Sequence, residues 1–357
     1  MSVDLLIRAA AVAELAILGV VFVRLFGWTR IGITGLVFLY GVVGYLTCPL
    51  AARHLASMLL QSPAFVACFG VGGFFWLFSR CLFDDGFRPS VGHGAVLAAA
   101  ILLGFLKRLA PTLPAELFGA APDSLAALLY QSMPQLASLG FVIAALTQLQ
   151  LGRAGDLVEA RRRFRDFLVV IAGAYIIVIA LVEIFLRQTV APAALEVVNV
   201  AGIMVVTTFF LTFLSIHRQA LGRITERPPA AATDPERPAL HQALNRAMEA
   251  EQAYRDDALT IGALAKRLGT QEYKLRRLIN QDLGHRNFNA FANGYRIAEV
   301  QRRLGEPQSA HLPILTLALE AGFRSIAPFN RAFKDQTGMT PTEYRRQESA
   351  TVRTSEP

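Results

Sequence analysis

The chain has 357 residues, 54% of them hydrophobic, and its mean hydropathy of +0.41 excludes an ordinary soluble protein. Its length allows two or more domains. Up to Gly222 there are 15 Lys+Arg against 11 Asp+Glu, and after it 20 against 16, so the shorter second part is more densely charged. A basic, polar module is typical of nucleic-acid binding, although many soluble domains are also mildly basic.

Seven apolar segments precede Gly222, at 9–26, 31–52, 64–83, 91–106, 125–149, 167–186 and 197–216. Most approach the roughly 20 residues that a helix needs to cross the hydrocarbon core, and the fourth is the shortest. Gly72, Gly73 and Pro134 would be costly in a soluble helix but are tolerated in membrane helices. The pattern predicts a seven-helix transmembrane bundle over residues 1–222.

Cysteine chemistry contributes little to the prediction. Cys48, Cys68 and Cys81 all lie in apolar stretches, where a thiol acts as a small buried hydrophobe. No Cys-x-x-Cys pair or His-Cys cluster indicates a metal, so we expect neither a metal nor another cofactor.

Ionisable and amide side chains inside the apolar segments are the candidates for a sensor site. Glu14 and Glu183 lie within segments, where they serve either helix pairing or a ligand or proton site. Gln131 and Gln135 belong to a polar run around Pro134, which indicates either a pocket or a kink satisfied by neighbouring helices.

A proline-rich stretch follows at 223–239, with prolines at 228, 229, 235 and 238. Its composition predicts a semi-extended linker. Residues 240–255 then place apolar side chains at helical spacing. We expect this helix to pack on the domain that follows, and dimerisation is the alternative role.

The last hundred residues contain an internal repeat. With a shift of 54 positions, residues 263–284 align with residues 317–338, so that Leu275 meets Phe329, Arg277 meets Arg331 and Gly284 meets Gly338. Each copy reads as a short apolar helix, a glycine-bearing turn and an amphipathic helix rich in cations and amides. That is a helix-turn-helix pattern written twice, here named the first head (259–284) and the second head (313–338).

In the first head, Thr260 is the predicted N-cap and Gly269 marks the turn. Its second helix is expected near 271–282, with an apolar face of three residues, Leu275, Leu278 and Ile279. The side chains expected to point outward are those of Tyr273, Lys274, Arg276, Arg277 and Asn280.

In the second head, Gly322 lies at the turn, Ser325 is the predicted cap, and Pro328 falls in the first helical turn, where its missing N–H costs little. The inward residues are Phe329, Ala332 and Phe333, and the outward ones are Ser325, Ala327, Asn330 and Arg331. One long amphipathic helix at 287–304 is expected to fix the spacing of the heads.

Two heads on one rigid helix suit successive major grooves, about 34 Å apart. Because Arg bonds guanine and Asn bonds adenine bidentately, Arg277, Arg331 and Asn330 are the leading base-reading candidates. We expect DNA backbone contacts from Lys274, Arg324, Ser325 and Lys334.

Residues 240–346 resemble the AraC/XylS family of bacterial transcription regulators. The resemblance is carried by LTIGALAKRLG, YRIAEVQRRL and ALEAGFRSIAPFNRAFKDQTGMTPTEYRR. It implies a seven-helix domain, assigned to 240–348 and followed by a disordered tail at 349–357. By position it implies base contacts from Tyr273, Arg276, Arg277, Ile326, Ala327, Asn330 and Arg331, although Ile326 and Ala327 offer no side-chain hydrogen bond.

The resemblance does not extend into residues 1–222, and the whole chain is similar to the less common members with a multi-helix membrane sensor. We therefore expect an all-α, membrane-embedded transcription regulator, with activation as the expected effect on its targets. Its expected partners are double-stranded DNA, the lipid bilayer, an unidentified small-molecule, lipid or protein signal, and a second copy in a homodimer.

A DNA-binding domain must be cytoplasmic, so seven crossings place the N-terminus outside a bacterial inner membrane. The predicted inner loops hold nine Lys+Arg against five outside, and five of the nine lie in GRAGDLVEARRRFRD. A cleaved signal peptide, suggested by the Ala-Val-Ala at 11–13, would put the heads outside and is rejected for that reason.

Two alternatives remain at the level of sequence. One is a membrane transporter or receptor with an appended regulatory domain, and the other is release of the DNA-binding part by proteolysis in the linker. An enzyme is not expected, since the chain has no HExxH, Walker A or GxSxG motif.

Overall fold

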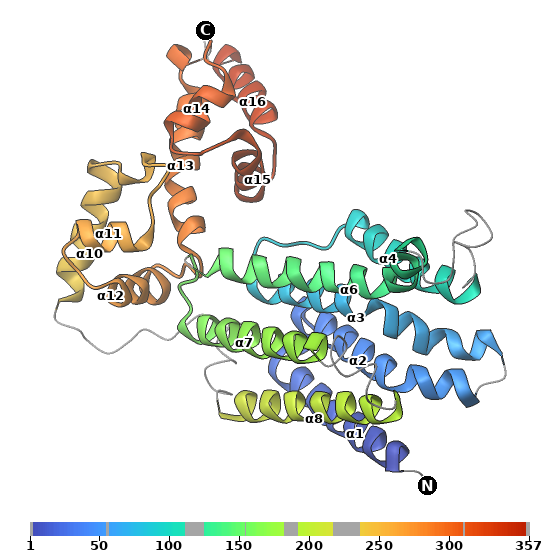
Figure 1. Ribbon diagram of the computed structural model, residues 1–357. Coiled ribbons are helices and arrows are strands. Elements are labelled where there is room, and N and C mark those ends of the chain that lie inside the picture. Colours follow the sequence, from blue (N-terminus) through green and yellow to red (C-terminus); the bar gives the residue numbers. More distant parts are fainter. Residues whose placement is uncertain are drawn as a thin grey trace. The chain divides into compact units, whose positions relative to one another are not determined.

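The computed structural model describes residues 3–54, 57–110, 125–153, 155–181, 192–216, 236–309 and 311–354 (Figure 1). Over these ranges the chain is helical and contains no β-strand, which confirms the all-α prediction. The chain divides into two compact units. The first unit comprises residues 1–152 and 163–225, and the second comprises residues 153–162 and 226–357.

Within the described residues, each apolar segment predicted from the sequence lies in a helix of its own. These are α1 (Val3–Phe26), α2 (Arg30–His54), α3 (Met58–Phe83), α4 (Val91–Leu109), α6 (Leu125–Gly152), α7 (Glu159–Leu181) and α8 (Pro192–Ile216). Six of them, all except α7, are long and apolar enough within the described residues to cross a membrane. Helix α7 begins with the charged sequence EARRRFRD, and the end of its predicted segment, 182–186, lies outside the described residues.

The helices of the first unit pack around an aromatic core. Phe22 of α1 lies 5.5 Å from Phe78 of α3 and 6.2 Å from Phe210 of α8, measured between ring centroids. Phe164 of α7 joins the same cluster, 5.4 Å from Phe210. Glycines let α2 and α3 approach closely, because a Cβ on Gly44 would lie 2.1 Å from Cβ of Ala67. Small residues at a helix contact are typical of membrane helix packing.

Large apolar side chains also cover much of the first unit's surface. Leu102 of α4 is 66% exposed, and Val96, Ile143 and Phe209 are more than half exposed. An exposed apolar surface of this extent is costly in water but not in lipid. The exposed apolar side chains therefore agree with the apolar composition of these helices, which are long enough to cross a membrane.

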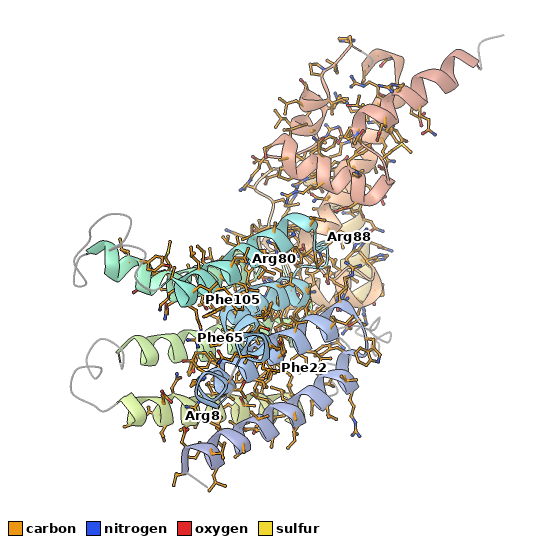
Figure 2. All side chains as sticks on the ribbon, turned by 90° about the vertical axis from the view of Figure 1, so that its right-hand side faces the viewer. Arg8, Phe22, Phe65, Arg80, Arg88 and Phe105 are labelled. Carbon is orange, nitrogen blue, oxygen red and sulfur yellow. The ribbon has the colours of Figure 1, made fainter. Side chains whose placement is uncertain are left out.

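Two arginines of the first unit are buried rather than free at its ends. Arg8, expected in an outer tail, lies within α1 and bonds Asp4, the carbonyl of Leu46 and Glu196, the last at 2.8 Å (Figure 2). Arg165, expected in an inner loop, donates to the carbonyls of Leu149 and Phe83, at 3.3 and 3.2 Å. Those carbonyls lie in the last turns of α6 and α3, where backbone C=O groups have no N–H partner within the helix.

The second unit contains seven helices in its described residues, as the family resemblance implied. They are α10 (Arg237–Asn245), α11 (Ile261–Arg267), α12 (Glu272–Arg277), α13 (Phe288–Gly305), α14 (Ile314–Glu320), α15 (Ile326–Thr337) and α16 (Pro341–Thr354). Helix α10 begins inside the stretch predicted as linker, with Pro238 at its second position, whereas residues 217–235 lie outside the described residues. Helix α16 runs into the expected tail and ends at Thr354.

Helix α13 is shared by the two hydrophobic cores of the second unit (Figure 1). Phe288 and Phe291, in its first turn, are buried in the core of the first head. Val300 and Leu304, near its end, are buried in the core of the second head. Asn287 is the N-cap of the helix, and its side-chain oxygen accepts from the N–H groups of residues 289 and 290.

Candidate nucleic-acid interface

The first head is built on α11 and α12. Thr260 caps α11 by accepting from the N–H of Ala263 at 3.2 Å, and Gly269 makes the turn with a φ of +64°. Helix α12 continues directly into a π-helical turn, Leu278–Asp282. Leu275, Leu278 and Ile279 are buried as predicted. Helix α10 and its π-helical continuation bury Leu244, Ala247 and Met248 in the same core, which confirms the packing role predicted for residues 240–255.

The second head is built on α14 and α15. Gly322 makes its turn with a φ of +96°, and a Cβ there would lie 2.5 Å from the carbonyl oxygen of Tyr254. Phe329 and Phe333 are fully buried, and Phe329 lies 5.1 Å from the ring of Phe323. Ser325 holds the N-cap position of α15, but its side chain makes no capping hydrogen bond. This architecture confirms the predicted pair of helix-turn-helix units.

The outward face of α15 matches the prediction. Ala327, Asn330 and Arg331 are exposed, and Ile326 beside them is 37% exposed. On the first head, Tyr273 is 61% exposed and Arg277 is also exposed, with its Nε donating to Gln281 at 3.0 Å. The aligned arginines, Arg277 and Arg331, thus both lie on accessible faces of their helices.

The expected outward position is wrong for Arg276 and Asn280, which are buried. Arg276 donates to Glu272 within its own helix and, from Nη1, to the backbone carbonyl of Asp156 at 2.5 Å. Asn280 lies within the π-helical turn and donates to the carbonyl of His285 at 2.9 Å. A π-helical turn has more residues per turn than an α-helix, so the face on which Asn280 lies shifts. Arg276 precedes this turn and is buried by its contact with Asp156.

The candidates for backbone contacts occupy different environments. Arg324 is 68% exposed and donates to the carbonyl of Asp257 at 2.9 Å. Ser325 and Lys334 are exposed at opposite ends of α15. Lys274 is partly buried and pairs with Glu236 at 2.5 Å. The second head therefore presents three of the four candidates to solvent.

Residues 155–161, which the sequence places between two apolar segments, form part of the first head. The N–H of Leu157 donates to the carbonyl of Arg286 at 3.0 Å, and the N–H of Phe288 donates to that of Gly155 at 2.8 Å. Asp156 and Asn287 form an isolated antiparallel bridge. The Leu157 side chain is buried among the first head's core residues. Helical periodicity gives no signal for this contact, because the two residues of the bridge lie 131 positions apart in the sequence.

Buried polar groups join α13 to the segments around it. Arg296 donates to the carbonyls of Tyr254 and Asp256, and burial lowers its pKa. Glu299 pairs with Arg255 at 2.6 Å, and the hydrogen bond to this carboxylate raises the pKa of Arg255. Burial lowers the pKa of His285, which stands between the first head and α13. These contacts are structural, since they point into the unit rather than out of it.

Of the four sensor candidates of the first unit, the structure describes the side chains of two, Glu14 and Gln135, which lie on different helices. Glu14 of α1 accepts from the Thr208 hydroxyl of α8, whereas Gln135 is exposed on α6, which packs against α3 and α4. The side chain of Gln131 and all of Glu183 lie outside the described residues. A polar chain that the prediction did not include links Tyr175 through Asn199 to Tyr45.

Compared with known protein families, residues 264–347 match a helix-turn-helix domain. The matched range runs from α11 to α16 and contains both heads. No curated protein and no solved structure matches the chain. The comparison supports DNA binding and transcription regulation by the C-terminal region.

Proposed function

We propose that the chain is a membrane-embedded, sequence-specific transcription regulator of the AraC type, which passes a membrane or envelope signal to DNA. The observation that carries the proposal is the pair of helix-turn-helix units on α13, in a chain with six apolar helices long enough to cross a membrane. DNA reading by paired heads and a membrane location together define this class of regulator.

The roles of the individual side chains follow from their chemistry and exposure. Arg277 and Arg331 present guanidinium groups suited to guanine, and Asn330 presents an amide suited to adenine. Tyr273 and Ala327 offer apolar contact to a thymine methyl group. Arg324 and Lys334 are placed for phosphate oxygens, which fix register rather than sequence. Arg276 belongs to the base-reading set only when its contact with Asp156 is broken.

The membership of residues 153–162 in the second unit supports the proposed topology. Segments that fold into one compact unit lie on the same side of a bilayer. The number of crossings between residue 162 and the heads is therefore even. Since α8 is a candidate span, we infer that α7 crosses as well. Seven crossings with a cytoplasmic DNA-binding domain correspond to an N-terminus outside a bacterial inner membrane.

The same unit favours a regulator that acts while tethered. Cleavage between residues 217 and 235 would leave Leu157 on the membrane side of the cut, and the first head would lose a buried residue of its core. The signal itself is a small molecule, a lipid or a protein at the first unit, where Glu14 and the Tyr45–Asn199–Tyr175 chain are the polar candidates.

The test is genome-wide DNA occupancy by the full-length chain, followed by binding of the recovered duplex to the chain in lipid nanodiscs. We expect a small set of sites, and an affinity that falls steeply with salt because each phosphate contact releases counterions. Equal binding to unrelated duplexes would exclude a sequence-specific regulator. Sedimentation of the heads with membranes, before and after induction, distinguishes the tethered form from a released one.

A further inference from the structure

Residues 155–161, named here the latch, connect two helices of the first unit but fold into the second. Helix α6 ends at Gly152, and the chain returns to the first unit from residue 163 onward. Between these points the latch pairs with the segment that precedes α13 and places Leu157, 4% exposed, in the core of the first head. The latch is therefore an intrachain partner of the first head.

A buried ion pair between two residues of the latch stabilises its conformation. The carboxylate of Asp156 lies 2.7 Å from Nε of Arg161, and both side chains are almost completely inaccessible to solvent. The other oxygen of Asp156 accepts from the N–H of Val158, and Arg161 reaches the carbonyl of Arg286 at 3.4 Å. Because breaking a buried pair leaves an uncompensated charge, loss of either partner destabilises the docked form.

The latch docks on a reading helix. Arg276 lies next to Arg277 on α12, at a position where the family resemblance implies a base contact. Its Nη1 donates to the backbone carbonyl of Asp156, and its side chain is only 8% exposed. Arg277 and Arg331 are exposed. The latch thus holds the guanidinium of Arg276, whereas Asn330, which aligns with Arg276 in the second head, is exposed.

We propose that the latch is the element through which the membrane helices control DNA reading. Docked, it keeps Arg276 from the major groove; undocked, it frees this guanidinium and exposes the surface of the first head beneath it. The proposal rests on the proposed function, because it gives the regulation of the same DNA-reading surface.

Helix α7 supplies a physical route for the signal. Arg161, in its first turn, is bonded within the second unit, whereas Arg165, one turn later, is bonded to the last turns of α3 and α6. A movement of α7 relative to α3 and α6 is therefore transmitted along one helical turn to the latch. A signal shifts the equilibrium between the docked and undocked latch only if it interacts differently with the two states.

The first test locks the latch in place. Asp156 and Asn287 are a non-hydrogen-bonded antiparallel pair, whose Cα atoms lie about 4.5 Å apart, within the range of a disulfide. The variant Asp156→Cys/Asn287→Cys, with Cys48, Cys68 and Cys81 changed to Ser, is purified full-length in nanodiscs. Its reduced form lacks the Asp156 carboxylate, which favours the undocked latch, and the disulfide of its oxidised form holds the latch docked in place of the ion pair. We expect the oxidised form to bind the recovered duplex at least about tenfold more weakly than the same sample after reduction.

The second test releases the latch and follows Arg276. Leu157→Ala should tighten DNA binding several-fold, and adding Arg276→Ala should remove that gain. Arg276→Ala alone should change affinity less than twofold in the otherwise unaltered chain, which makes the two substitutions non-additive. If the latch is only a permanent part of the head, oxidation changes nothing and Leu157→Ala weakens binding, which overturns the proposal.

Arg331→Ala separates this failure from a failure of the proposed function. The residue lies on α15 of the second head, whereas Leu157 of the latch is buried in the core of the first head. Loss of affinity in Arg331→Ala, with no effect of locking or release, overturns the latch and leaves DNA reading intact. Absence of any sequence-specific binding overturns the proposed function and the latch with it.

Discussion

The two heads follow one plan but differ in how much of the second helix is accessible. In the second head, α15 is a regular helix of 12 residues with Asn330 and Arg331 exposed. In the first head, α12 passes into a π-helical turn, and Arg276 and Asn280 are buried. The comparison teaches that a repeat in sequence conserves the core spacing of a motif but not the accessibility of its polar face.

The largest expected effect is on stability, and it shows whether the stability of each head depends on its own hydrophobic core. Phe329→Ala removes a fully buried ring between Phe323 and Phe333, and we expect a loss of about 3–5 kcal/mol in the stability of the second head. Leu275→Ala is the matched change in the first head. Hydrogen exchange on the full chain should show local loss of protection in the head that carries the change. Equal loss in both heads would mean that they unfold as one.

The turns of the heads differ in crowding. Gly322→Ala places a Cβ 2.5 Å from a backbone oxygen at a φ of +96°, and we expect it to cost about 2–4 kcal/mol. Gly269→Ala, in the turn of the first head at a φ of +64° with nothing within 4 Å of its Cβ, should cost only about 1–2 kcal/mol. Denaturant midpoints for the two variants measure the difference. Similar midpoints would show that the backbone near Tyr254 moves aside at little cost.

The aligned arginines test the reading faces directly. Arg331→Ala should cost about 1–3 kcal/mol of binding free energy and relax specificity at one base pair. Arg277→Ala should act likewise at a different base pair. Binding to a library of single-base variants of the recovered duplex locates both positions. A uniform loss across all sequences would instead assign the arginine to a phosphate.

The N-caps of the heads predict a smaller difference. Thr260→Ala removes a hydrogen bond to the N–H of Ala263 and should cost about 1 kcal/mol. Ser325→Ala removes a side chain that makes no capping bond, so its effect on stability should be a few tenths of that value. Thermal unfolding followed by circular dichroism distinguishes the two. An equal cost would show that Ser325 caps α15 in solution.

The smallest predicted effect concerns pH. Burial lowers the pKa of His285 in the folded chain below its value in the unfolded chain. The unfolded chain then binds the proton more readily, so stability present at neutral pH decreases as the pH falls through about 6.5. His285→Gln should flatten this dependence, as read from hydrogen exchange of the first head at pH 5.5 and 7.5. An unchanged dependence would assign it to another group.

Sequence patterns predicted what depends on local spacing. The seven apolar segments, the glycine turns, the Thr260 cap and the buried faces of α12 and α15 all follow from periodicity and turn chemistry. The buried arginines could not be found in this way. Arg8, Arg161 and Arg165 appear as ordinary charges at segment ends, and their partners are carbonyls or carboxylates set by tertiary packing. Arg276 was misjudged for the same reason, because the carbonyl that binds it belongs to residue 156.

Helix α13 sets the spacing between the two heads, and therefore the spacing of the DNA sites that they can bind together. At about 1.5 Å per residue, its 18 residues measure about 27 Å, less than the roughly 34 Å of one duplex turn. Because each end of α13 is buried in the core of one head, the spacing between the heads cannot increase to make up the difference. We therefore expect an operator bound by both heads to curve toward the protein, and flexible pyrimidine–purine steps between the contacted bases should favour recognition without being touched.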